Sequence, residues 1–262
     1  MTRTWITLAL CCAAGQLSAQ FTTTFQGIER DGDKDVPASA TFSVENGRVA
    51  MLMKGAHSSR MLFDQTAQVL RVVNDEDKTY FDIDKHAGSG VDAMMASMKK
   101  QLDAMPAAQR AMAEQMMQGA MGSMSQPTPL EYVRTREKLT VAGYECTRVE
   151  GMRGQTKTTE YCGTTSDDFK ISDAERQTIL EMQGYLRNFT IMVKSADDAT
   201  RAFQWDLNAD GYPVITRCFK NGKLSLDLTF QSLSRTPIPD AVFAVPTDFK
   251  KVDMNAMMRP GR

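Results

Sequence analysis

The feature that most constrains this fold is a strict two-residue alternation of apolar and polar side chains near the C-terminal end. In residues 224–231, Leu and Phe at the even positions alternate with Ser, Asp, Thr and Gln at the odd positions. Successive side chains of a strand point to opposite faces, so this strand has one apolar and one polar face. The preceding Asn221-Gly222 step is a strong hairpin signal and pairs it with a strand over residues 212–220. The apolar face of the resulting antiparallel sheet must be covered.

Similar extended segments, separated by turns, fill most of the remaining chain. They are short and evenly spaced, which predicts an antiparallel meander. Before the middle of the chain, strands are predicted at residues 21–30, 40–45, 48–54, 59–63, 68–73 and 78–83. After it, they are predicted at residues 131–138, 141–150 and 156–162.

Between these two groups of strands, over residues 89–124, the apolar residues are spaced as in a helix. This segment holds nine of the nineteen methionines, spaced so that they fall on one side of a helix. Ser89 can cap a first helix, and Pro106 suits the first turn of a second one. We therefore predict two methionine-rich helices, over residues 89–105 and 106–121.

A third helix is predicted to begin after residue 171. Ser172 and Glu175 have the spacing of a capping box, and an apolar stripe follows them up to residue 193. Its far end stays open, because residues 188–193 are β-branched enough to form a strand instead.

These three helices are the material available to cover the apolar side of the sheet, so the sequence predicts an α+β fold. Methionine side chains are unbranched and polarizable, and a surface made of them can repack around a bound molecule. Ordinary core packing is the alternative explanation of the same stripe.

The last hairpin also allows a prediction of register. With a two-residue turn at 221–222, Pro213, Ile215 and Phe219 would lie on the apolar face and Cys218 on the polar face. Arg217 would then lie opposite Leu226, inside the apolar row, where it could bind an acid headgroup. An arginine that extends its charged end to solvent at the sheet edge is the competing interpretation.

The candidate ligand-binding residues come from the strands and from the methionine-rich helices. They are Met51, Met53, Met94, Met98, Leu102, Met105, Met112, Met116, Arg217, Leu226 and Leu228. Thioethers are also ligands for Cu(I), and two groups could each supply three sulfurs. These groups are Met94, Met95 and Met98, and Met112, Met116 and Met117.

The first nineteen residues have the three-part layout of a secretory signal. A cation at Arg3 precedes an apolar run over residues 5–14, and small residues lead to a predicted cleavage site after Ala19. The run is too short for a membrane anchor, which needs roughly 20 apolar residues. Lipidation at Cys11 or Cys12 lacks the small preceding residue. We expect a periplasmic or secreted protein with one domain over residues 20–251 and a disordered tail over 252–262.

Three cysteines follow this signal. Cys146 and Cys162 belong to strands that flank a predicted turn at residues 151–154, so their thiols can meet across a hairpin. Pairing of either one with Cys218 is the competing arrangement.

Charge and motifs exclude several classes of function. The formal net charge is −1, which disfavours a nucleic-acid partner, and no later segment is apolar and long enough to cross a membrane. Beyond the signal, the histidines are His57 and His86, which lack zinc-ligand spacing. The acidic segment at 31–35 begins like a calcium loop, but Val36 stands where that loop requires glycine and Phe42 where it requires glutamate. We interpret the segment as a solvated turn. We predict no catalytic residue, cofactor or metal site.

A set of short motifs, taken in their order along the chain, suggests a family. After the signal and the meander come KTYFDI at 78–83, the methionine-rich insertion at 89–124, GYEC at 143–146 and IPDAVFAVPTDF at 238–249. This set resembles an uncharacterised family of secreted bacterial proteins, which in turn resembles the lipoprotein-carrier (LolA-like) half-barrels. The resemblance implies a curved antiparallel sheet with helices on its concave side and a cavity for acyl chains. It carries over no catalytic residue.

Three functions therefore stay open. The first is binding of an apolar small molecule or lipid between the curved sheet and the methionine-rich helices. The second is a non-catalytic interaction with an envelope protein, and the third is methionine-based binding of Cu(I).

Overall fold

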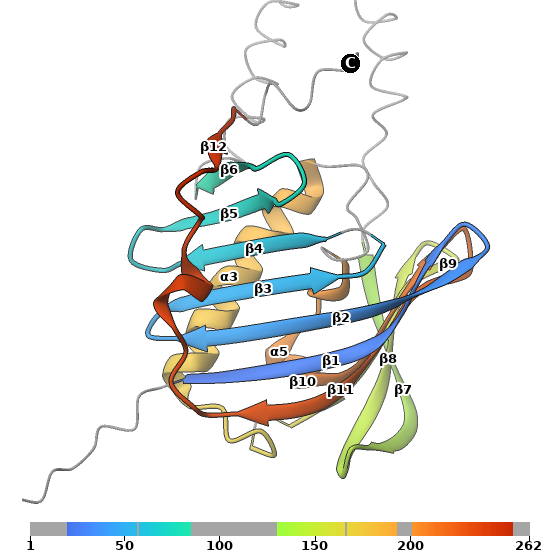
Figure 1. The fold of residues 1–262 in the computed structure, drawn as a ribbon. Coiled ribbons are helices and arrows are strands. Elements are labelled where there is room, and N and C mark those ends of the chain that lie inside the picture. Colours follow the sequence, from blue (N-terminus) through green and yellow to red (C-terminus); the bar gives the residue numbers. More distant parts are fainter. Residues whose placement is uncertain (1–19, 57, 85–129, 166, 193–200, 254–262) are drawn as a thin grey trace, which may run out of the picture.

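A single twelve-stranded sheet dominates the structure, a computed structural model that describes residues 20–56, 58–84, 130–165, 167–192 and 201–253 (Figure 1). The strands are β1 (Gln20–Asp31), β2 (Lys34–Glu45), β3 (Arg48–Lys54), β4 (Ser59–Asp64), β5 (Val69–Asn74), β6 (Thr79–Asp84), β7 (Leu130–Val141), β8 (Tyr144–Arg153), β9 (Thr156–Thr164), β10 (Tyr212–Lys220), β11 (Lys223–Ser234) and β12 (Lys250–Lys251). Helical elements that lie within the described residues are α3 (Asp173–Met192), α5 (Leu207–Asp210) and the 3-10 turn η1 (Asp240–Phe243).

The sheet consists of two meanders joined side by side. Its strand order is β12-β6-β5-β4-β3-β2-β1-β11-β10-β9-β8-β7. The first meander is β1 to β6, the second is β7 to β11, and β1 pairs with β11 to join them. Neighbouring strands are antiparallel except β12, which runs parallel to β6. The predicted antiparallel meander is confirmed.

The tight hairpin turns have the backbone that their residues predict. Asn46 and Gly47 have φ values of 48° and 78°, and Asn221 and Gly222 have 53° and 75°. Positive φ at both central residues matches the right-handed twist of the flanking strands.

Several strands extend further than their hydrophobic pattern. β2 begins at Lys34, six residues before its predicted start at position 40, and the acidic segment 31–35 turns the chain between β1 and β2. The tip of this hairpin is exposed, so no apolar alternation marks it in the sequence. The prediction of a turn at this place is confirmed.

The predicted α+β fold with about three helices is wrong, because the described chain is dominated by its sheet. The helix predicted from residue 172 is confirmed as α3, whereas α5 is a single turn. The methionine-rich helices predicted at 89–105 and 106–121 lie outside the described residues, as do the signal and most of the tail. Among the described residues, α3 lies on the concave side of the curved sheet (Figure 1). Buried aromatic side chains belong to the same core.

Among the described residues, a hydrophobic core lies on each face of the sheet. The larger one lies on the concave face, where α3 packs against β2, β3, β5 and β6. The smaller one lies on the outer face, where the segment after β11 crosses the strands and covers Ala50, Leu62 and Val73 with Phe243 (Figure 1). No described helix is both long and apolar enough to cross a membrane.

Candidate functional site

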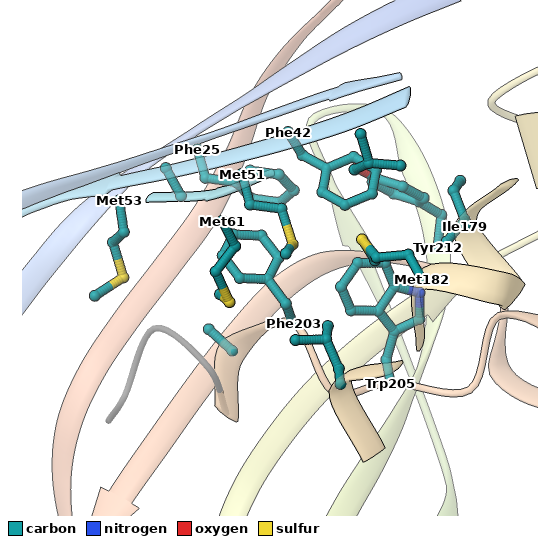
Figure 2. Close-up of a cluster of buried hydrophobic side chains, with 14 of the residues drawn as sticks. Phe25, Phe42, Met51, Met53, Met61, Ile179, Met182, Phe203, Trp205 and Tyr212 are labelled. Atoms are coloured by element: carbon teal, nitrogen blue, oxygen red, sulfur yellow. The ribbon is translucent and has the colours of Figure 1, made fainter. Parts of the chain in front are cut away.

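Three methionines from two neighbouring strands lie together on the concave face. Met51 and Met53 alternate along β3, and Met61 of β4 is the direct cross-strand neighbour of Met51. Their exposed fractions are 1%, 3% and 2%, so all three are buried. Figure 2 shows them at one end of the buried cluster, with Ile179 and Met182 of α3 toward the other end. We call Met51, Met53 and Met61 the methionine patch.

Aromatic rings fill the concave face next to this patch. Phe42 lies 6.0 Å from Phe203 and 5.7 Å from Trp205, measured between ring centroids, and Tyr212 packs against both Phe42 and Trp205. A void lined by Phe25, Phe203, Trp205 and Tyr212 has a volume of only about 10 Å³, close to the smallest that holds one water. This part of the concave face leaves no room for a ligand.

The structure brings together several of the predicted ligand-binding residues and leaves others undescribed. Met51, Met53, Leu226 and Leu228 all face the concave core. The remaining predicted methionines and Leu102 lie outside the described residues. Met61 was missed by sequence reasoning, although its position in a predicted strand beside β3 was the available signal.

The predicted place of Arg217 in the apolar row is wrong. A β-bulge between Cys218 and Phe219 shifts the register, so that Cys218 pairs with Leu226 and Arg217 pairs with Asp227. The prediction counted back from the turn at 221–222. The extra residue of the bulge places the side chains of β10 from Cys218 back toward its start on the face opposite to the predicted one. Cys218 is consequently buried, while Arg217 lies on the polar face.

Arg217 belongs to an ion-pair network on that polar face. Its guanidinium donates to Glu160 at 2.9 Å and to Asp227 at 3.1 Å, and Glu160 also accepts from Lys157 at 2.7 Å. Burial alone would raise the pKa of Glu160, but the hydrogen bonds from Lys157 and Arg217 outweigh it and hold this pKa below its usual range. The partners of Arg217 are therefore carboxylates of the chain, and it is not available for an acid headgroup on the concave face.

A carboxylate lies on the concave face instead. Glu29 of β1 is 7% exposed, and its Oε2 accepts a hydrogen bond from the backbone N–H of Ala56 at 2.8 Å. The strand pairing places Glu29 beside Leu226, in the row where Arg217 was expected. Sequence reasoning missed it because residues 29 and 56 meet only after β1, β2 and β3 have paired.

The predicted disulfide is confirmed. Cys146 of β8 and Cys162 of β9 are bonded, with their Cα atoms 5.4 Å apart. Cys218 is buried and is not part of this disulfide.

Larger recesses lie elsewhere on the described surface. A groove of about 400 Å³ runs on the outer face between strands β1 to β4 and residues 234–242. A recess of about 360 Å³ lies near Arg134 and Asp210. There Asp210 accepts from the Tyr161 hydroxyl at 2.6 Å, and burial followed by this hydrogen bond raises the tyrosine pKa.

Metal ligands do not gather in the described part of the chain. No group of three His, Cys, Asp or Glu there could hold a metal ion. His57 and His86 lie outside the described residues.

Comparisons with known proteins do not supply a family. No protein-family model and no curated protein matches the chain. Among solved structures, it is similar to an uncharacterized conserved protein from Thermus thermophilus, at 9% identity and a TM-score of 0.42, over 90% of this chain and 91% of that chain. A likeness this weak carries no argument about function.

Proposed function

We propose that the protein is an exported binding protein that holds an apolar molecule, such as an acyl chain, against the methionine patch. The observation that carries this proposal is the grouping of three thioether side chains on adjacent strands of a concave surface. Methionine adapts its shape at little cost, so these side chains can repack around a guest. Each buried CH₂ group of that guest contributes about 0.8 kcal/mol.

The packing next to the patch supports this location. The aromatic cluster around Phe42 is filled, and rings in close contact resist rearrangement. Adaptability is therefore concentrated at the end of the concave face that carries Met53 and Met61. Because the three thioether side chains are buried, a guest must displace the atoms that cover them.

The disulfide supports export. Disulfides persist in oxidising compartments and are rare in the cytosol. The bond between Cys146 and Cys162 agrees with the secretory signal predicted at residues 1–19.

The test is titration of a fluorescent long-chain alcohol, which carries no charge, into the purified mature protein, together with native mass spectrometry of the same sample. We expect saturable uptake and a lipid that co-purifies. Replacing both Met53 and Met61 by Leu keeps volume and hydrophobicity but removes flexibility, and should weaken binding about fivefold, which corresponds to about 1 kcal/mol.

Met182→Leu is the matched control, because Met182 is a buried methionine of α3 beside the aromatic cluster. The Met182→Leu variant should bind the probe as tightly as the unmodified protein does. If the unmodified protein takes up none of this alcohol and its native mass shows no bound lipid, the proposed function is wrong.

A further inference from the structure

Glu29 is a charged residue on the apolar side of its strand. β1 pairs with β2 without irregularity, so Phe25, Gly27 and Glu29 share one face. Phe25 belongs to the concave core, and Leu226, the neighbour of Glu29 on β11, is fully buried. The carboxylate therefore lies within an apolar surface.

Small residues make room for this carboxylate beside the methionine patch. A Cβ atom on Gly55 would lie 2.1 Å from Glu29 Oε2 and 3.5 Å from the Cβ of Ala38. Any larger residue at position 55 would displace the carboxylate. Gly55 directly follows the end of β3 at Lys54, so the carboxylate lies near the end of the strand that carries Met53.

Glu29 differs from the other buried glutamates of the described chain in having no cationic partner there. Glu45 pairs with Arg48, Glu160 with three cations, and Glu175 with Arg235. For Glu29, the hydrogen bond from Ala56 is the interaction that the described residues supply. A buried carboxylate is costly unless a cation or several hydrogen bonds compensate it.

We infer that the ligand of the methionine patch carries a cationic group, such as a protonated amine, which Glu29 binds while the apolar chain contacts Met53 and Met61. This inference rests on the proposed function and names its ligand class, a cationic amphiphile. It reverses the preference for an acid headgroup that the expected position of Arg217 implied.

The experiment compares three probes with the same twelve-carbon chain: dodecylammonium, dodecanoate and 1-dodecanol. Binding to the mature full-length protein is measured by isothermal titration calorimetry below the micellar concentrations. At pH 8 histidine is neutral and the amine is charged. Dodecylammonium should bind at least about tenfold more tightly than dodecanoate, with dodecanol between them.

Glu29→Gln keeps an acceptor for the Ala56 N–H but removes the charge. It should bring the ammonium and alcohol affinities within about twofold of each other and leave the alcohol affinity itself nearly unchanged. Glu76→Gln, at an exposed turn position, makes the same change in net charge and should leave the preference intact. If Glu29→Gln does not fold, the ranking of the three probes on the unmodified protein decides.

The outcomes separate the two proposals. If dodecanol binds but dodecylammonium does not bind more tightly than the other two probes, the proposal of a cationic ligand is wrong. The same holds if the preference for dodecylammonium is unchanged in Glu29→Gln. In both cases the proposed apolar site is unaffected. If none of the three probes binds, the proposed function fails and the inference fails with it. An equal loss of preference in Glu76→Gln would show attraction by net charge alone and would also overturn the role of Glu29.

Discussion

Arg235 holds three separate segments together where the chain leaves β11. Its guanidinium donates to Glu175 at 2.7 Å, to the backbone oxygen of Gln20 at 3.1 Å and to that of Phe169 at 3.0 Å. The Glu175 side chain is fully buried, and it also accepts from the backbone N–H of Ser172, which closes the first turn of α3. Loss of Arg235 would leave this buried carboxylate without its cation.

The perturbation is Arg235→Met, which keeps an apolar stem and removes the charge. Breaking a buried ion pair from one side costs about 3–5 kcal/mol. The Arg235 side chain is 35% exposed, so water compensates part of this cost and we expect a loss of about 2–4 kcal/mol. Since domains of this kind are stable by about 5–15 kcal/mol, the variant should still fold at 25 °C.

The assay is urea unfolding at pH 7 with the disulfide intact, from which the midpoint and slope yield the free energy of unfolding. Glu175→Gln is combined with Arg235→Met in a double-mutant cycle. Because the amide needs no cation, the double variant should be more stable than the sum of the single losses by about 1–3 kcal/mol. Arg30→Met, which breaks the exposed pair of Arg30 with Asp35, should cost less than about 1 kcal/mol. A loss below about 1 kcal/mol for Arg235→Met, or strict additivity in the cycle, would refute the reasoning.

Three further predictions concern stability. Replacing Cys146 and Cys162 by Ala should lower the free energy of unfolding by about 3 kcal/mol, because the bond joins residues 16 apart in sequence; an unchanged urea midpoint would contradict this. The lowered pKa of Glu160 contributes stability that is present above its unfolded pKa of about 4.3 and is lost as the pH falls through the folded value. In unfolding curves between pH 3 and 7, the free energy of unfolding should therefore fall less steeply with acid for Glu160→Gln than for the unmodified protein. Gly27→Ala should lower the free energy of unfolding by at least about 2 kcal/mol, because its Cβ would lie 1.7 Å from a backbone carbonyl oxygen of β11. Gly184→Ala in α3, whose Cβ would meet no neighbouring atom within 4 Å, should be neutral or stabilising by up to about 1 kcal/mol. Equal effects of the two variants would contradict this.

Features that depend on neighbouring residues were predictable. The Asn46-Gly47 and Asn221-Gly222 turns need positive φ at both positions, and these residue types adopt it at low cost. The capping box at Ser172 and Glu175 forms as expected, with Glu175 accepting from the Ser172 N–H at 2.7 Å. The Cys146–Cys162 disulfide also followed from local order, because a hairpin brings its two strands together whatever the rest of the chain does.

The candidate site was predictable only in part. Met51 and Met53 could be assigned to an apolar strand face from their alternation, and the structure confirms that face. Met61 and Glu29 could be added only once the pairing of β4 with β3 and of β1 with β2 and β11 was known.

What the amino-acid order alone determined is therefore the series of strands, their tight turns, the start of α3 and the disulfide, since each depends on backbone preferences within a few residues. The tertiary structure decided which charge lies on the concave face. One bulge at Cys218 and Phe219 places Arg217 on the polar side, and the pairing of β1 with β11 places Glu29 on the apolar side. Side chains alternate every residue, so a one-residue irregularity set by distant packing reverses the chemistry of a whole strand face.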